Sequence, residues 1–177
     1  MSTSPRDRHE LRRAVDAAER ERPRPAALDR LGLAAGLQAL AADESWPPIE
    51  IDIAVDLDFE AGRHPARLLP DLELSVFRIV QEALVNAARH AGARHATATV
   101  EEAAGRLTVE IVDDGAGFDP ATVTRGAGLT GTEERAQLLD GTLELRAAAG
   151  EGTRIRVTLP ATHRAPADPP AGSPASA

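Results

Sequence analysis

The sequence predicts one domain of mixed α-helices and β-strands, an α+β fold. Residues 70–91 carry apolar side chains at steps of three and four, the spacing of a helix with one buried face. Residues 49–56 and 106–112 alternate apolar and polar side chains, as half-buried strands do. Two glycine-rich stretches, DDGAGFDP and GAGLTG, follow the central helix. With 177 residues, the chain has room for this domain and for tails.

The composition favours a core of aliphatic side chains and excludes several classes of function. Hydrophobic residues make up 42% of the chain, with three Phe, one Trp and no Tyr. The formal net charge is -8, so no direct binding of nucleic acid is expected. The absence of cysteine excludes disulfides and thiolate metal sites. No apolar run has the length of a membrane span and no signal-peptide pattern follows the charged start, so we expect a soluble, cytoplasmic protein.

The N-terminal part of the chain is expected to contain a charged arm and then a helix. The arm, residues 1–25, is interpreted as flexible or partly helical, because RDRHELRRAVDAAERER offers only a thin apolar stripe. Its single histidine, His9, is interpreted as a solvated side chain. A helix is predicted over residues 26–42. Its apolar side is formed by Leu28, Leu31, Leu37 and Leu40.

The central helix and the strands after it have recognisable boundaries. Pro70 suits the first turn of the helix, and Gly92 suits a position just past its end. Residues 95–101 and 106–112 should pair as a hairpin. The second strand runs directly into Asp113, so the hairpin ends in an acidic, glycine-rich turn.

The last third of the chain alternates between loop, helix and strand signals. Residues 122–127 have no clear period and should form a mobile loop, and residues 129–139 can form a short helix. Two further strands are predicted over residues 142–146 and 153–159. Residues 161–177 are rich in Pro and Ala and should be disordered.

The central helix carries polar residues along one edge. At about 100° per residue, Glu82, Asn86 and Arg89 fall within about 60° of one another. A solvated helix face is the ordinary interpretation of such an edge. Because the glycine-rich residues 113–120 and 126–131 follow at suitable distances, a nucleotide site is the sharper hypothesis.

The residue types in these segments suit a bound nucleotide. A carboxylate at a strand end, such as Asp113, can accept a hydrogen bond from the exocyclic amine of adenine. Gly115 and Gly117 allow positive φ and close approach of the backbone to a flat ligand, although an ordinary Asp-Gly turn is the alternative. The glycines of GAGLTG precede a helix whose free N–H groups can hold phosphates. The oxygen of Asn86 suits Mg²⁺, and Glu82 can orient a metal-bound water or act as general base.

Two other nucleotide motifs fit less well. GAGLTG matches the dinucleotide fingerprint GxGxxG, but that fingerprint requires a strand directly before it and an acidic residue at the end of the next strand. A loop precedes it here, and Glu151 lies in another glycine-rich turn. A Walker P-loop is excluded because the chain contains no Lys.

Four segments in order, QEALVNAARHAGA, DDGAGFDP, GAGLTGTEERAQLLDGTLEL and GEGTRIRVTLP, resemble the sequence boxes of the GHKL ATPase superfamily. They are most similar to the catalytic ATP-binding domain of the sensor histidine kinases that pair with NarL/LuxR-type response regulators. The resemblance covers roughly residues 28–160, so the ATPase domain is assigned to residues 26–160. It implies the Bergerat fold, a two-layer α/β sandwich with a mixed, mostly antiparallel sheet and helices on one face.

The resemblance also assigns roles to individual residues. It implies that Glu82 and Asn86 are the catalytic pair and the residues nearest Mg²⁺. Asp113 would contact the adenine amine, and Gly128 with Leu129 would belong to a lid over the phosphates. The ATP-binding residues that it implies are Asn86, Arg89, His90, Asp113, Gly115, Gly117, Gly126, Gly128, Leu129, Gly152 and Thr153.

The resemblance implies partners as well as ligands. Such kinases carry a phosphoacceptor histidine on a dimerisation helix, and RHELRRAVD lacks the His-Asp pair of that motif. Autophosphorylation within this chain is therefore not supported, and the acceptor is expected on a dimerisation domain outside it. The expected partners are ATP, Mg²⁺, that domain and a NarL/LuxR-type response regulator. Two alternatives stay open: a GHKL anti-sigma factor of the serine-kinase type, and an inactive nucleotide-binding regulatory module.

Overall fold

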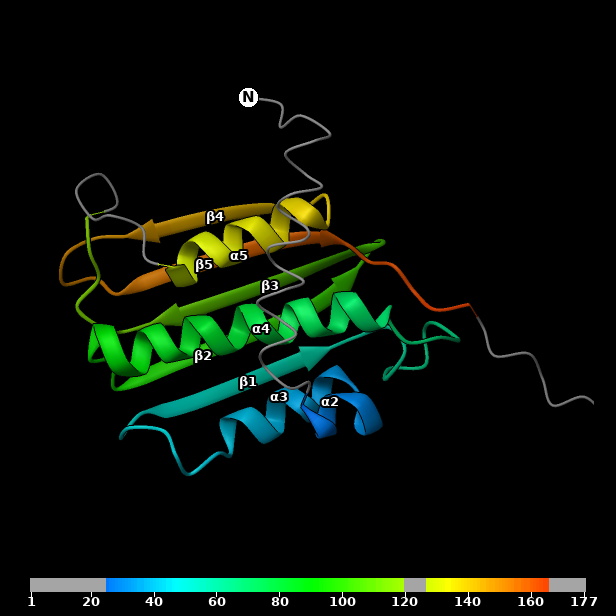
Figure 1. Ribbon diagram of the computed structural model, residues 1–177, viewed down its shortest axis with the longest axis horizontal. Coiled ribbons are helices and arrows are strands. Elements are labelled where there is room, and N and C mark those ends of the chain that lie inside the picture. The colour runs from blue at the N-terminus through cyan, green and yellow to red at the C-terminus, as the bar shows by residue number, and fades with distance from the viewer. Residues whose placement is uncertain (1–24, 120–126, 166–177) are drawn as a thin grey trace, which may run out of the picture.

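The fold is a two-layer sandwich in which helices cover one face of a five-stranded sheet (Figure 1). The computed structural model describes residues 25–119 and 127–165. The strand order is β1-β2-β3-β5-β4, with β1 parallel to β2 and every other neighbouring pair antiparallel. The predicted α+β fold with a mixed, mostly antiparallel sheet is confirmed. The strands are β1 (Glu50–Asp56), β2 (His95–Ala103), β3 (Arg106–Asp113), β4 (Thr142–Ala147) and β5 (Thr153–Pro160).

The helical layer lies in front of the sheet in Figure 1, with α4 along its middle and α5 near β4 and β5. Helix α3 contacts both β1 and α4, so it closes the other side of the layer. Among the described residues, no helix is both long and apolar enough to cross a membrane. The helical elements are α2 (Ala26–Leu31), α3 (Leu33–Ala41), α4 (Pro70–Asn86), the π-helical turn η1 (Ala87–Ala91) and α5 (Ala127–Leu138).

The core fills the space between α4 and the inner face of the sheet. Alternate residues of β2, β3 and β5 point toward the helices, as their burial patterns show. Removing such aliphatic side chains from water contributes about 1.5–3 kcal/mol each. The largest group of core side chains comes from α4 and is formed by Leu72, Val76, Phe77, Ile79, Val80, Ala83 and Leu84.

Helix α4 begins and ends where the sequence predicts. Pro70 occupies its first turn, where a missing N–H costs nothing. The helix continues into η1 and ends at Gly92, which adopts the left-handed conformation with φ 60°. A π-turn has more residues per turn than an α-helix, so the assumed 100° per residue fails beyond Asn86. Arg89 lies within this turn and is exposed.

The helix predicted over residues 26–42 is instead two helices. Gly32 separates them with φ 94°, a conformation that interrupts the helix. The guanidinium of Arg67 fills the space beside it, where a Cβ atom on Gly32 would lie 2.9 Å from Nη2. The break changes the phase of the apolar pattern, so Leu31 is 66% exposed while Leu28 is fully buried. Leu33 takes the buried position that was predicted for Leu31.

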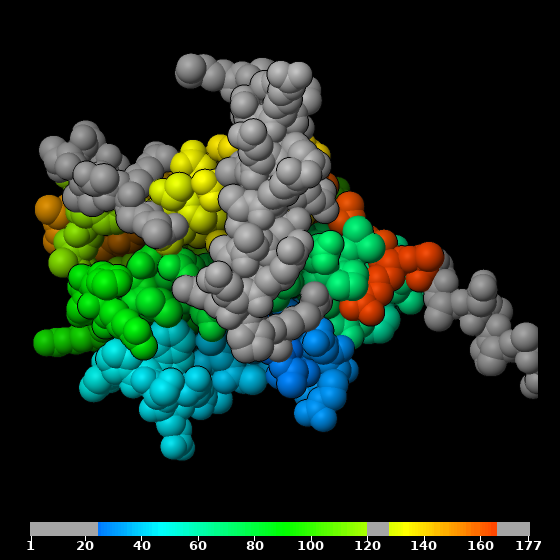
Figure 2. All heavy atoms as spheres, in the orientation of Figure 1, coloured from blue at the N-terminus to red at the C-terminus, as the bar shows by residue number. Residues whose placement is uncertain are grey.

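The folded domain extends beyond residue 160, the predicted boundary. Residues 161–165 lie against the connection that precedes α4. Figure 2 shows these two segments as neighbours at one end of the molecule. Backbone hydrogen bonds join Leu69 N to the Thr162 oxygen at 2.8 Å and Arg164 N to the Arg67 oxygen at 2.9 Å. The prediction of disorder was therefore wrong for this segment. Residues 166–177, the arm at 1–24 and most of the predicted loop at 122–127 lie outside the described residues.

Candidate functional site

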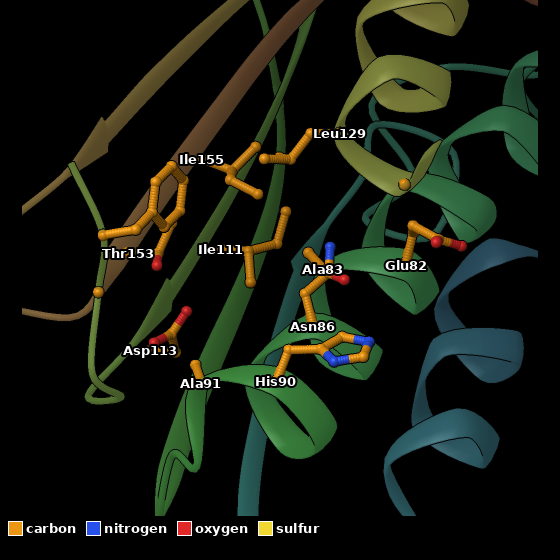
Figure 3. Close-up of a pocket in the computed structure, with 13 residues that line it drawn as sticks. Glu82, Ala83, Asn86, His90, Ala91, Ile111, Asp113, Leu129, Thr153 and Ile155 are labelled. Atoms are coloured by element: carbon orange, nitrogen blue, oxygen red, sulfur yellow. The ribbon is translucent and has the colours of Figure 1, made fainter. Parts of the chain in front are cut away.

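A cavity of about 600 Å³ opens beside the C-terminal end of α4 (Figure 3). Its size is that of a pocket for a small organic ligand. The walls come from α4, η1, the end of β3, the first residues of β5 and the start of α5. The lining residues are Glu82, Ala83, Asn86, His90, Ala91, Ile111, Asp113, Gly117, Phe118, Gly128, Leu129, Thr153 and Ile155.

The helical wall presents the predicted polar residues. Glu82 and Asn86 lie one turn apart on α4, so their side chains share one side of the helix. Both are half-buried, and His90 of η1 continues the same wall. Arg89 is exposed and does not line the cavity. A carboxylate, an amide and an imidazole therefore meet at this side.

The opposite wall is formed by the end of β3. Asp113 is its last residue and faces the same side of the sheet as Ile111. Its Oδ1 accepts a hydrogen bond from Gly115 N at 2.9 Å, which fixes the carboxylate. Among the described residues, none donates to Oδ2, so that oxygen stays available as an acceptor. Asp113 and Asn86 thus lie on opposite walls of one cavity, as Figure 3 shows.

An apolar surface connects the two polar walls. Ile111 and Ile155 are partners in the β3–β5 register, and both are buried. Ala83 and Leu129 extend this surface from α4 and α5. The sequence predicted Leu129 but missed Ile111, Ile155 and Ala83, together with Ala91 and Phe118. The alternation of β3 carried a signal for Ile111, because a residue two positions before Asp113 shares its face.

The glycines near Asp113 allow two loops to approach each other. Gly117 has φ 58°, and a Cβ atom there would collide with the carbonyl oxygen of Ala148. Gly150 N donates to the Ala116 oxygen at 2.7 Å, which joins the same loops. Neither Gly115 nor Gly152 lines the cavity, although Gly152 packs against the Asp113 carbonyl.

The start of α5 closes the cavity on the side of Glu82. Gly128 and Leu129 both belong to the lining, and a Cβ atom on Gly128 would lie 2.6 Å from Glu82 Oε1. The first backbone N–H groups of a helix have no partner within it and attract anions. Gly126, the remaining glycine of the predicted lid, lies outside the described residues.

The oxygen donors in the cavity suit a cation shared with a ligand. Within residues 25–119 and 127–165, no group of three or more His, Cys, Asp and Glu side chains could hold a metal by itself. The cavity instead offers the amide oxygen of Asn86 and the carboxylate of Glu82. Mg²⁺ takes few protein ligands and completes its shell with phosphate and water oxygens, so this donor set fits it.

Two pKa shifts occur beside the cavity. The pKa of Asp114 is lowered from its ordinary value because its carboxylate accepts hydrogen bonds from the backbone N–H groups of His95 and Arg94. The pKa of His95 is raised, chiefly by its hydrogen bond to Asp52, whose Oδ2 lies 2.9 Å from Nε2. Asp114 and His95 lie where the turn after β3 meets the start of β2, next to Asp113. Neither residue lines the cavity.

Comparison with known proteins identifies the family of this domain. The family described as histidine kinase-, DNA gyrase B- and HSP90-like ATPase matches residues 71–163. The chain is 36% identical over 137 residues to the signal transduction histidine-protein kinase/phosphatase DegS of Brevibacillus brevis, covering 77% of this chain and 34% of DegS. It is 40% identical over 106 residues to the sensor histidine kinase YxjM of Bacillus subtilis (strain 168), covering 60% of this chain and 25% of YxjM.

A solved structure shares the fold. The histidine kinase domain of the Erythrobacter litoralis EL346 blue-light activated histidine kinase superimposes with a TM-score of 0.59 at 20% identity, covering 73% of this chain and 63% of that one. The chain spans about a third of DegS and a quarter of YxjM. Because the family match covers more than half of the sequence, the chain belongs to the histidine kinase-, DNA gyrase B- and HSP90-like ATPase family and contains an ATP-binding domain of the sensor histidine kinase type.

Proposed function

We propose that this domain binds Mg-ATP and is the phosphoryl donor of a two-component sensor histidine kinase. The observation that carries the proposal is the convergence of Asp113 and Asn86 on one cavity from opposite walls. The acceptor is a histidine on a dimerisation domain, and a NarL/LuxR-type response regulator receives the phosphoryl group from it. The reaction takes place in the cytoplasm, where ATP is available.

The base lies between the sheet and η1. Asp113 Oδ2 accepts a hydrogen bond from the exocyclic amine of adenine, and a guanine oxygen at that position would be repelled. Ile111 and Ile155 give the flat ring an apolar surface, and Ala91 with its small side chain leaves room opposite. The proposal also keeps Arg89, Gly115, Gly126 and Gly152 in the ATP-binding set, in addition to His90 and Thr153 of the lining.

The phosphates lie between α4 and the start of α5. Asn86, assisted by Glu82, would hold Mg²⁺, which supplies positive charge against the phosphate oxygens. The first N–H groups of α5 donate to the same phosphates, with Gly128 allowing close approach. In the transfer, the acceptor imidazole forms a bond to the γ-phosphorus and the bond to the bridging β-γ oxygen breaks. Glu82 is placed to accept the proton that the imidazole loses.

The histidine kinase assignment is favoured over the two alternatives. DegS and YxjM are both named as histidine kinases, and this chain is 36% and 40% identical to them over the aligned residues. The family match over residues 71–163 contains every residue that lines the cavity. Glu82, Asn86 and Asp113 line one cavity, and an inactive module would not require this combination of side chains.

Labelled phosphate tests the proposed reaction. The chain is incubated with γ-labelled ATP, Mg²⁺ and the purified dimerisation domain of a DegS-type kinase, and the label on that domain is followed. We expect a phosphohistidine, which is stable in base and labile in acid, and its loss with Asn86→Ala. Retained ATP binding without transfer, or transfer to serine, would contradict the catalytic part of the proposal.

A further inference from the structure

We propose that Asp114 is a positioning residue that sets the geometry of the base site from outside the cavity. Its side chain is exposed and does not line the cavity, in contrast to its neighbour Asp113. The inference rests on the proposed ATP site and identifies what holds its two walls at their spacing.

The carboxylate of Asp114 binds two backbone N–H groups where β2 begins, those of Arg94 and His95. Its Oδ1 accepts hydrogen bonds from Arg94 N at 2.8 Å and from His95 N at 2.9 Å. In the opposite direction, Asp114 N donates to the His95 oxygen at 3.2 Å. The turn after β3 is thereby joined to the start of β2 through a single side chain and one backbone bond.

A second connection joins this turn to the π-turn at the end of α4. Ala116 N donates to the Ala91 oxygen at 2.8 Å. Gly115 packs so closely that a Cβ atom on it would lie 2.5 Å from Ala91 Cβ and 2.8 Å from the Ala91 oxygen. The π-turn η1 presents this carbonyl group, and π-turns of this kind are frequent at functional sites.

These contacts determine the distance between the two sides of the base site. Ala91 and His90 belong to one wall, while Asp113 and Gly117 belong to the other. Asp114 links two parts of the base site. It directly follows Asp113, the proposed contact of the adenine amine, and its carboxylate lies against the segment Gly92–Arg94, which follows Ala91 of the first wall in the sequence. If its carboxylate is lost, the turn can move relative to η1 while the phosphate side near α5 is untouched.

The proposal requires an acceptor oxygen at one place rather than a negative charge. Asn supplies the same oxygen without the charge, since its Oδ1 can accept both N–H groups. Glu keeps the charge but places its oxygens one methylene further out. The two substitutions therefore separate geometry from electrostatics.

The test compares binding of ATP and of inorganic tripolyphosphate, which lacks a base, by isothermal titration calorimetry at fixed Mg²⁺. We expect Asp114→Ala and Asp114→Glu to weaken ATP binding by about tenfold and Asp114→Asn by less than about threefold. Tripolyphosphate affinity should stay within about twofold of the wild type in all three. Asp43→Ala is the matched control, because Asp43 is also exposed and its Oδ1 accepts a backbone N–H from Ser45 at 2.8 Å outside the cavity.

The outcomes separate this inference from the proposed function. If the wild type binds ATP and Asp114→Glu binds it equally well, the positioning role is wrong while the ATP site stands. If Asp114→Asn is as weak as Asp114→Glu, or tripolyphosphate binding falls in parallel with ATP binding, the role is also wrong. Should Asp114→Ala fail to fold, the Glu and Asn variants decide between these results. A wild type that binds no ATP would overturn both proposals.

Discussion

At the scale of single residues, Asp113 combines a fixed position with a free acceptor. Gly115 N holds Oδ1, so replacing Asp113 with Asn leaves that bond possible and puts an amide NH₂ where Oδ2 stood. Two donors would then face each other at the adenine amine. A mispaired buried polar group costs about 1–3 kcal/mol, so we expect Asp113→Asn to weaken ATP binding roughly tenfold to a hundredfold. Calorimetric titration measures this, and unchanged affinity in a folded variant would refute the assigned role.

Two glycines of the cavity should respond differently to the same substitution. Gly117→Ala introduces a methyl group against the Ala148 carbonyl at positive φ, so we expect a loss of at least about 2 kcal/mol in unfolding free energy. In Gly128→Ala the new methyl group meets the flexible end of Glu82, which can move away. We therefore expect nearly normal stability but about tenfold slower phosphotransfer. Thermal melts and transfer rates check this, and equal melting losses in both variants would contradict it.

The sequence located most of the polar site but little of its apolar surface. Residue type and spacing predict a chemical role where few alternatives exist, as for Glu82, Asn86 and Asp113, and all three line the cavity. Ile111 and Ile155 are ordinary core residues by pattern. The alternation of β3 places Ile111 on the face of Asp113, but only the β3–β5 register shows that Ile155 lies beside it. The roles of the lining residues in binding ATP stay predictions.

At the scale of secondary-structure elements, the parallel pair β1–β2 carries a titratable contact. His95 of β2 reaches Asp52 of β1, and the pKa of His95 is raised by that hydrogen bond and by nearby carboxylates. Because the pKa of His95 is higher in the folded protein than its ordinary value of 6.5, protonation of His95 stabilises the fold. This contribution is complete below pH 6.5 and is lost as the pH rises through the pKa of the folded protein. We expect His95→Gln, which keeps a donor without the charge, to lower unfolding free energy at pH 6 and to match the wild type at pH 9.

Urea unfolding across this pH range measures the effect. Asp52→Asn is the control, because it removes the negative charge of the same contact from the partner strand and should show the same convergence at high pH. A difference between His95→Gln and the wild type that stays constant from pH 6 to pH 9 would mean that the contact does not act through protonation.

The ends of helices could be predicted from the local sequence, whereas contacts between segments that are distant in the sequence could not. Pro70 and Gly92 act through their own backbone preferences, so the limits of the central helix were predictable. The break at Gly32 depends on Arg67, which is remote in the sequence, and a Leu-rich pattern does not reveal it. The parallel pairing of β1 with β2 is likewise a non-local contact that alternation within each strand does not specify.

At the scale of the whole molecule, α4 links two polar regions. Its C-terminal end forms the cavity, while Glu73 in its first turn is 2% exposed and is held by Arg67 at 2.8 Å and Arg164 at 3.4 Å. Burial raises the pKa of Glu73, and the two guanidinium groups oppose that effect. The position of the helix, and hence of Glu82 and Asn86, therefore depends on an ionic cluster at its far end.

Residues 161–165 complete that cluster, although their composition predicted disorder. Besides Arg164, the segment contributes His163, whose Nε2 lies 2.8 Å from Glu102 Oε1 and whose ring stacks on His64 with centroids 3.6 Å apart. The Glu102 side chain is only 1% exposed. Low-complexity composition reports on average hydrophobicity and cannot show that two particular side chains meet buried carboxylates elsewhere in the fold.

Two chains that end at residue 165 and at residue 160 isolate the contribution of this segment, because both lack residues 166–177. The shorter chain loses the Arg164 partner of Glu73 and the His163 ring beside the Glu102 carboxylate. Breaking one partner of a buried pair costs up to about 3–5 kcal/mol, so we expect the shorter chain to melt roughly 6–20 °C lower. Differential scanning calorimetry compares the two, and ATP affinity measured well below both midpoints tests whether α4 keeps its position. Equal midpoints would show that the ionic cluster adds nothing to stability and that the sheet and α4 hold the fold alone.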